Sequence, residues 1–234
     1  MRLIPAIAPL ALALAVFAVA ASAQDAPRMI TVTGVGEIVA PPDMAIVTVG
    51  ATSEAETAAE ALSATSLAVS AALNVLTGAG IEARDLQTSG VSLSPRMVWP
   101  NDGNGAPRIE GYVASNQVTA RVRDLGSLGG VLDAVVSSGA NTLSGVSFAL
   151  SEPRAAEDAA RRAAVADARA RAALYAEAAG VGLGAVQQIS EEGGAAPMQR
   201  MMAAEAAMSD AAVPVAPGEL TISARVRIVF AIAD

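Results

Sequence analysis

The side chains that can do chemistry are few in this sequence, and four of them are methionines of one segment: Met198, Met201, Met202 and Met208. Thioether sulfur is a soft ligand that suits Cu(I), and it is reversibly oxidised to the sulfoxide. The segment is therefore a candidate Cu(I) site or a set of oxidisable groups. The alternative that we favour is a methionine- and alanine-rich loop that holds no ligand.

Three reactive residue types are missing altogether. The chain has no Cys, no His and no Lys, so all 15 basic residues are Arg. These absences exclude disulfides, thiolate metal sites, imidazole general bases and Schiff-base chemistry. A serine nucleophile would lack its usual base, and GVSLS at residues 90–94 lacks the second glycine of a nucleophile elbow. The sequence predicts no cofactor and no catalytic residue.

Carboxylates are the remaining candidates for catalysis. Glycoside hydrolysis needs two of them facing each other across a cleft. Five acids lie near predicted strand ends or on a helix: Asp43, Asp85, Glu110, Asp124 and Asp133. Turns and helix caps are the commoner use of Asp, so we expect structural roles for them.

Arginines form two Arg-x-Arg patterns in predicted strands, Arg121 with Arg123 and Arg225 with Arg227. If those strands are neighbours, the four guanidiniums share one sheet face and can bind an anion or a partner's carboxylates. The alternative, which we favour, is a solvated sheet face or a contact between copies of the chain.

The N-terminal segment and the net charge indicate where the protein is located and which partners it is expected to bind. Residues 1–23 combine Arg2, an apolar stretch and Ala21-Ser22-Ala23, which predicts a signal peptide cleaved after Ala23 and export to a bacterial periplasm. An uncleaved membrane anchor is the alternative, and no later stretch is expected to span a bilayer. Cleavage of the signal peptide would remove Arg2 and change the formal net charge from -8 to −9. Such an acidic chain is not expected to bind nucleic acid.

The elements that must position these residues follow from the hydrophobic pattern. Residues 111–150 read strand, helix, strand, and Tyr112, Ala114, Val118, Ala120 and Val122 share the dry face of the first strand. Other strands are expected at residues 29–40, 44–51, 86–98, 185–191 and 219–232, the last long enough for a central or a long edge position. Helices are expected at about 53–78 and 153–179.

Caps and turns set the expected boundaries. Ser53 and Glu56 form a capping box, followed by an apolar stripe at Ala58, Leu62, Thr65, Val69, Ala72 and Leu76. Asp124 is the expected N-cap of the helix near residues 125–136. Residues 41–43 (PPD) predict a turn between the first two strands.

Glycines and loops complete the expectations. Gly34 and Gly36 indicate a bulge or a close backbone approach, since GVGEIV lacks the third glycine of a dinucleotide fingerprint. Residues 99–108 and 193–218 are expected to be flexible loops. Trp99, the only tryptophan, is expected at the rim of its loop, with a binding platform as the alternative.

Several ordered segments together resemble the SIMPL (DUF541) family, which includes the 26 kDa periplasmic immunogenic protein group. The segments are ITVTGVGEIVAPPDMAIVTVG, LQTSGVSLSPR, GYVASNQVTARVRDL, SSGANTLSGVSFALSEP, AVADARARAALYAEAAGV and PGELTISARVRIVF. The resemblance implies an α+β fold and no established catalytic residue. It also implies self-association and a link to envelope and oxidative stress.

The sequence thus predicts a single SIMPL-like domain over residues 24–234. Its expected order is ββαββαβαββ, with mixed or antiparallel sheets and helices on one face. We expect a non-enzymatic, exported protein that forms a homo-oligomer, contacts an envelope protein of unknown identity and does not insert stably into a membrane after signal cleavage. A periplasmic small-molecule or Cu(I) binder is the alternative function.

Overall fold

The computed structural model describes residues 28–99, 106–193, 198–200 and 215–233. The elements are β1 (Met29–Ala40), β2 (Met44–Ala55), α1 (Ala58–Gly78), η1 (Ala83–Asp85), β3 (Leu86–Val98), β4 (Arg108–Val122), α2 (Leu128–Ser137), β5 (Thr142–Ala149), α3 (Arg154–Ala178), β6 (Gly182–Glu191), β7 (Met198–Arg200) and β8 (Glu219–Ala233). The expected α+β class is confirmed, and η1 and β7 are added to the expected order. The short strand β7 lies inside the segment expected to be a loop.

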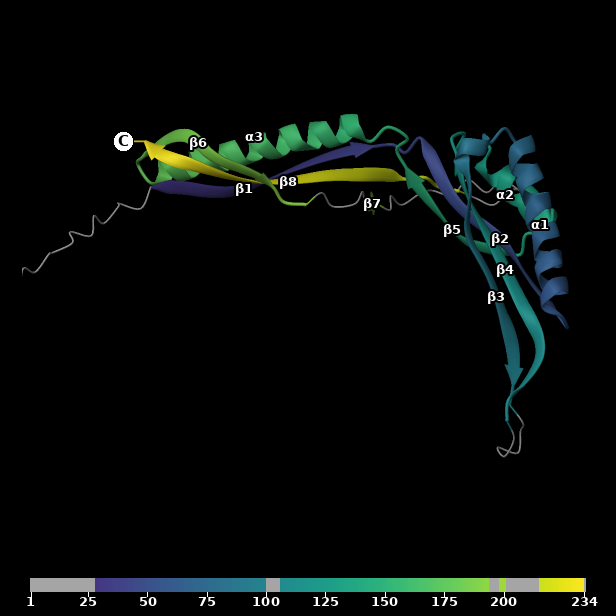
Figure 1. Ribbon diagram of the computed structural model, residues 1–234. Coiled ribbons are helices and arrows are strands. Elements are labelled where there is room, and N and C mark those ends of the chain that lie inside the picture. The colour runs from purple at the N-terminus through teal and green to yellow at the C-terminus, as the bar shows by residue number, and fades with distance from the viewer. Residues whose placement is uncertain (1–27, 100–105, 194–197, 201–214, 234) are drawn as a thin grey trace, which may run out of the picture.

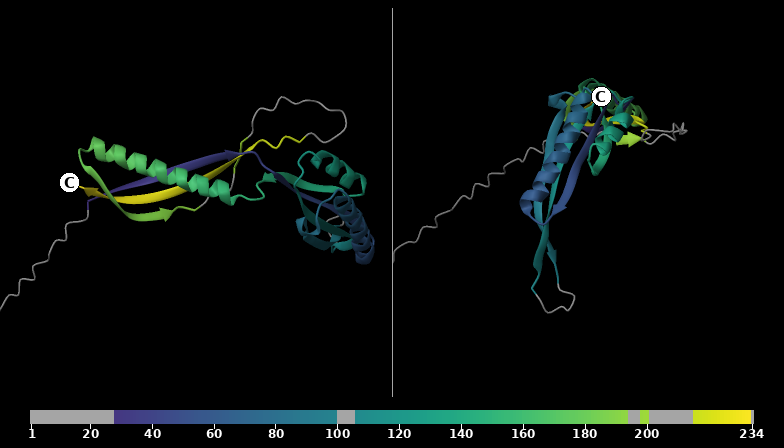
Figure 2. Two further views of the ribbon diagram at one scale, coloured as in Figure 1. Left: turned by 90° about the horizontal axis from the view of Figure 1, so that it is seen from above. Right: turned by 90° about the vertical axis from the view of Figure 1, so that its right-hand side faces the viewer.

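Two antiparallel sheets form two arms that meet at a corner (Figure 1). The first sheet has the order β1-β8-β6, with β7 also paired to β8, and carries α3; we call this unit the α3 arm. The second has the order β3-β4-β2-β5 and carries α1 and α2; we call it the α1 arm. Figure 2 shows the same two arms from above and from the end. In both arms the helices lie on the outer side of the corner and leave the other sheet face uncovered.

The strand–helix–strand unit β4–α2–β5 supplies much of the α1 arm, as the sequence predicts. Both strands flank β2 and run antiparallel to it. The buried residues of β4 alternate along one face, and together with β2, α1 and α2 they form the core. Leu128 and Val135 of α2 are among its most completely buried side chains.

Helix α1 begins four residues later than the Ser53 capping box predicts. The capping box is instead formed by Thr57 and Glu60: the Glu60 N–H donates to Thr57 Oγ1, and Glu60 Oε2 accepts from the Thr57 N–H. Ser53 lies in β2, opposite Ala114 of β4. The pairing of β2 with β4 up to Ala55 delays the helix, because a residue in the ladder cannot also serve as its cap.

The stripe predicted for α1 is largely confirmed, with one shift at its N-terminal end. Thr65, Val69, Ala72 and Leu76 are buried as expected, but Ala61 is buried in place of Leu62. The hydroxyl of Thr65 can be buried because it donates to the carbonyl oxygens of Ala61 and Ala114, at 2.9 and 3.1 Å.

Helix α2 also begins later than predicted, at Leu128, so Asp124 is not its N-cap. The Asp124 carboxylate accepts the Gly126 N–H at 3.0 Å, which closes a local turn before the helix. Asp side chains stabilise such turns by bonding the backbone two residues on. Asp124 therefore stabilises this turn and lies three positions before Ser127, the observed N-cap of α2.

Two glycines bring the backbones of β1 and α3 close together in the α3 arm. A Cβ at Gly34 would overlap the carbonyl oxygen of Ala164, and one at Gly36 would overlap that of Ala160. Helix α3 presents a stripe of buried alanines to the sheet, at residues 160, 164, 168, 172 and 176. The close backbone approach predicted for these glycines is confirmed.

The first two strands do not form a hairpin, although a turn was expected at residues 41–43. Strand β1 pairs with β8, whereas β2 pairs with β4 and β5. The segment Pro41–Asp43 therefore carries the chain from one sheet to the other at the corner (Figure 1). Strand β8 takes the central position of its sheet, which is one of the two positions that its length indicated.

Candidate interaction surface

Strand β3 is a long edge strand whose side chains are exposed along nearly its whole length. It has 13 residues, and its intermediate positions are at the two ends. It pairs with β4 on one side and ends its sheet on the other. Such an edge offers a row of unpaired backbone donors and acceptors to another polypeptide.

The odd-numbered residues of β3 form an apolar row, which we call the β3 row: Val91, Leu93, Pro95 and Met97, continued by Trp99. Leu93 lies opposite the buried Ala114 of β4, so the row belongs to the face that the helices cover elsewhere. Helix α1 packs mainly over β4 and β2 and leaves the row open. Val91 is 60% exposed and Trp99 is 70% exposed.

The β3–β4 ribbon extends past the end of β2, and its end extends the apolar row. Pairing of β2 with β4 ends at Ala55 and Tyr112, whereas β3 and β4 continue to Val98 and Arg108. Beyond β2, Ile109 lies opposite Met97 and is 52% exposed. The projecting ribbon is visible below the rest of the arm in Figure 1. The high exposure of Trp99 fits both a loop rim and a contact surface.

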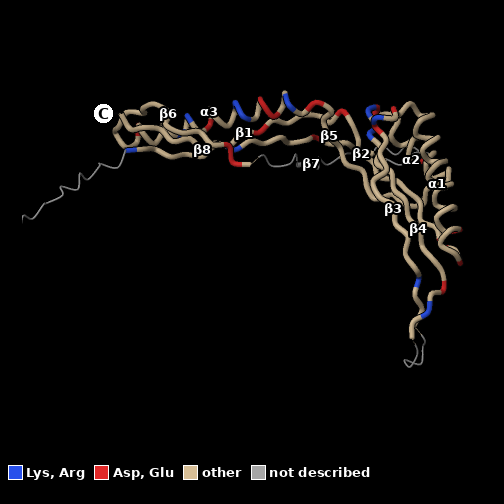
Figure 3. Tube along the Cα trace, viewed as in Figure 1, with Lys and Arg blue, Asp and Glu red and all other residues tan. Residues whose placement is uncertain are grey.

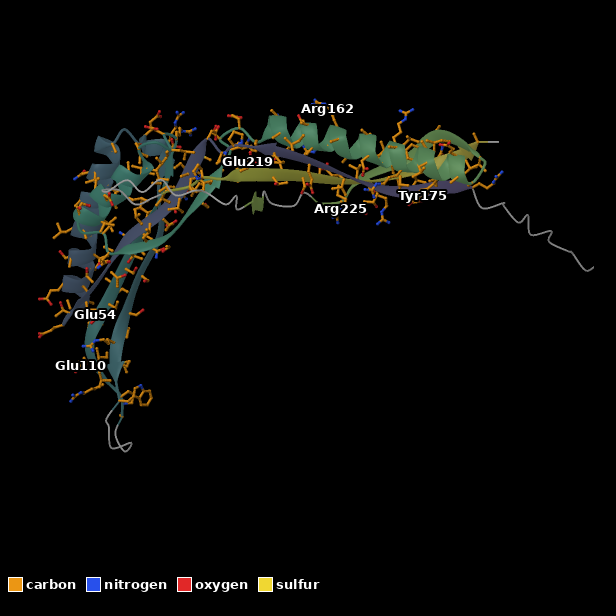
Figure 4. All side chains as sticks on the ribbon, turned by 180° about the vertical axis from the view of Figure 1, so that it is seen from behind. Glu54, Glu110, Arg162, Tyr175, Glu219 and Arg225 are labelled. Carbon is orange, nitrogen blue, oxygen red and sulfur yellow. The ribbon has the colours of Figure 1, made fainter. Side chains whose placement is uncertain are left out.

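Charged side chains are sparse on this surface. Arg96 is the one charged residue of β3, and it pairs with Glu110 at 2.9 Å and with Glu54 at 3.7 Å. Figure 4 shows both glutamates near the projecting end of the α1 arm. In Figure 3 most of the β3–β4 ribbon carries no charge. Natural edge strands are commonly protected by charges, and β3 has little of this protection.

The four arginines of the two Arg-x-Arg patterns do not share a sheet face, which corrects the expectation for neighbouring strands. Arg121 and Arg123 belong to the α1 arm, whereas Arg225 and Arg227 lie in β8 of the other sheet. The pattern could not show this, because sheet membership depends on pairing between distant segments.

Two of these four guanidiniums have carboxylate partners. Arg123 binds both oxygens of Asp85, at 2.8 and 2.9 Å, and Arg227 binds Glu192 at 2.7 Å. Arg225 lies on the uncovered face of the α3 arm, on the opposite side from Arg162 of α3 (Figure 4). The structure therefore provides no four-arginine anion site.

A pocket of about 160 Å³ lies between the end of α1 and the end of β4, and it contains two of the five candidate carboxylates, Asp85 and Asp124. Asp85 is 5% exposed and fully engaged by Arg123. The hydrogen bond from Arg123 lowers the pKa of Asp85 below its ordinary 3.8, more than burial raises it. A general acid at neutral pH needs a raised pKa, so Asp85 is not suited to that role.

The other candidate carboxylates have separate positions. Asp43 lies at the corner, where hydrogen bonds from Ser151 lower its pKa. Glu110 is paired with Arg96, and Asp133 lies on α2. Within the part of the chain that the structure describes, no group of three or more acids is arranged to hold a metal ion.

The candidate methionines fall mostly outside the described residues. Met198 lies in β7, opposite Thr221 of β8. Met201, Met202 and Met208 lie outside the residues that the structure describes, so a Cu(I) site there stays a prediction. The predicted signal peptide and its predicted cleavage after Ala23 lie outside the described residues too, so they also stay predictions.

Helix α1 is long and apolar enough to span a membrane, with 21 residues and a mean hydropathy of 1.4. By length and composition, the expectation that no stretch after the predicted signal peptide could span a bilayer is therefore wrong. The helix packs its buried face against β2 and β4, as core helices of folded domains do.

Sequence reasoning placed β3 correctly but missed its apolar row. The signal was present, because Val91, Leu93, Pro95 and Met97 alternate with Ser92, Ser94 and Arg96. Alternation predicts two unlike faces of a strand. It does not show that the apolar face lies beyond the reach of the helix.

This two-arm α+β fold, with no assembled catalytic group among the described residues, is that of the SIMPL family, and the chain belongs to it. The family model, described as "Protein of unknown function (DUF541)", matches residues 30–230. A similar protein is the 26 kDa periplasmic immunogenic protein of Brucella melitensis biotype 1, 41% identical over 214 residues, which cover 88% of this chain and 85% of that protein. The Brucella abortus protein of the same name has the same identity and coverage. The uncharacterized protein YggE of Escherichia coli K12 is 28% identical over 186 residues, 78% of this chain and 74% of its own length.

Proposed function

We propose that this is a non-enzymatic periplasmic protein that acts through self-association and contact with other envelope proteins, in the setting of envelope or oxidative stress. Its similarity to proteins named periplasmic supports the location. The names of its relatives include no enzyme, which supports a role without catalysis. The observation that carries the proposal is the open edge of β3 with its uncovered apolar row.

A second copy of the chain is the occupant that suits this edge. Two β3 strands running antiparallel about a two-fold axis near Leu93 would continue the sheet and place one apolar row beside the other. Such an interface uses the same residues on both copies. Because the chain is strongly acidic, copies repel each other over most of their surface. The β3 row is uncharged, so this repulsion is least there.

The test measures the mass of mature protein, residues 24–234, by light scattering during size-exclusion chromatography. We expect an assembly whose mass falls when Val91 and Leu93 are both changed to Lys, because lysine in the row must be desolvated and brings like charges together. The matched control is Leu174→Lys on α3, where the leucine is 62% exposed and lies far from β3. A wild-type monomer at high concentration, or a double variant that assembles like wild type, would contradict the proposal.

A further inference from the structure

The two arms are connected by two chain crossings, and each carries proline. The first crossing, between β1 and β2, contains Pro41 and Pro42, and the second, between β5 and α3, contains Pro153. Proline fixes its own φ angle and donates no backbone hydrogen bond. The crossings are therefore locally stiff, but they contribute few backbone hydrogen bonds of their own.

The packing of the helices does not determine the angle between the arms. Helix α3 packs on β1 and β8 of its own arm, and α1 packs on β4 and β2 of the other. The buried residues accordingly form separate clusters, two in the α1 arm and one in the α3 arm. Units without a large shared apolar interface are expected to move relative to each other. The contacts that fix the angle between the arms must therefore lie at the crossings.

One carboxylate ties the two crossings together. Asp43 accepts the Ser151 N–H through Oδ1 and the Ser151 hydroxyl through Oδ2, both at 2.7 Å. Its own N–H donates to the Ala149 carbonyl oxygen at 3.2 Å. These bonds continue the β2–β5 ladder past its last pair, Met44 with Ala149, to the point where both chains leave the α1 arm. Both carboxylate oxygens are used, so the tie is directional.

Two apolar contacts also lie near the corner. Val215, which precedes β8, is partly buried against the α1-arm core, and Leu150, in the second crossing, is partly buried against the α3-arm core. Apolar burial resists separation but has no preferred direction. The Asp43–Ser151 hydrogen bonds are directional, so they can constrain orientation in a way that these apolar contacts do not.

We propose that the Asp43 carboxylate is the latch that holds the two arms at a fixed angle, and that the arms bend about the two crossings when the latch is removed. The proposal goes beyond self-association and does not depend on it. Bending at the corner reorients the β3 row relative to the α3 arm without changing either sheet.

The experiment measures the distance between the arms directly. Because the chain has no Cys, single cysteines at Ser70 of α1 and Ala173 of α3, both exposed, accept spin labels at those positions alone. Double electron–electron resonance on labelled protein diluted into unlabelled protein reports distances within one molecule. We expect a narrow distance distribution for the otherwise wild-type chain and a clearly broadened one for Asp43→Ala.

Two further variants make the result decisive. Ser151→Ala keeps the backbone bond and removes only the hydroxyl bond, so we expect a smaller broadening. Glu152→Ala removes the neighbouring carboxylate, which has no hydrogen bond or ion pair among the described residues, and should leave the distribution narrow. Circular dichroism checks that both sheets remain folded; if Asp43→Ala fails to fold, Ser151→Ala alone decides. A distribution as narrow as wild type in the folded latch variants overturns the proposal, whatever the assembly state.

Discussion

At the scale of single residues, the pair Asp85–Arg123 is the polar contact whose loss has the clearest expected effect. Asp85 is buried at the end of η1, whereas Arg123 is half exposed. Removing a charged partner from a buried hydrogen-bonded pair costs about 1–3 kcal/mol. We expect Asp85→Asn to lower the free energy of unfolding at pH 7 by about that amount, as measured by urea denaturation.

The same variant should change how stability depends on pH. Arg123 lowers the pKa of folded Asp85 below the ordinary 3.8, so the pair stabilises the protein above that value, and its contribution is lost as pH falls through the folded pKa. The stability difference between wild type and Asp85→Asn should therefore shrink between about pH 5 and pH 2. Asp133→Asn on α2 is the control. A difference that stays constant over this range would contradict the assignment.

Predictability from the sequence was uneven at this scale. The alternation along β4 correctly identified Ala114, Val118, Ala120 and Val122 as buried, because period two is a local property, although Tyr112 of the same predicted face is only half-buried. The partners of the arginines were not predictable. Arg123 bonds a carboxylate 38 residues away and Arg227 one that is 35 residues away, and nothing in the local pattern brings those segments together.

At the scale of elements, the contact between β1 and α3 depends on the absence of two side chains. A Cβ at Gly34 would overlap the backbone of α3 at Ala164 and Ala168, and neither backbone can move without disrupting the alanine stripe. We expect Gly34→Ala to destabilise the fold by about 3 kcal/mol or more in urea unfolding. Gly90→Ala in β3, where the new methyl meets nothing within 4 Å, is the matched control and should be nearly neutral. Equal stability of the two variants would show that α3 does not pack as described.

The boundaries of elements were predicted less well than their existence. Ser53 with Glu56 and Thr57 with Glu60 are both capping-box patterns in one short stretch. The structure uses the second, since β2 continues to Ala55 beside β4. Strand pairing with a distant segment decided between two equally good local signals.

At the scale of the whole molecule, the two arms have separate cores and should lose stability separately. Leu128 is completely buried in the core of the α1 arm. Leu-to-Ala changes at such sites cost about 2–5 kcal/mol. In Leu128→Ala we expect faster amide hydrogen exchange in β2 and β4, with the protection of β8 retained. The conservative variant Leu128→Met should keep both arms protected, and a uniform loss of protection in Leu128→Ala would show that the arms unfold as one unit.

The chain enters the α1 arm after β1 and returns for α3, so the whole of that arm is an insertion within the other sheet. Strand β1 pairs along its full length with β8, the last strand of the chain. During synthesis the α1 arm can therefore finish folding early, while β1 and the alanine face of α3 wait for the fifteen residues of β8. Truncation before Glu219 would leave an intact α1 arm followed by a helix without its sheet. For a nascent chain, the α3 arm can thus be completed only after β8 has been synthesised.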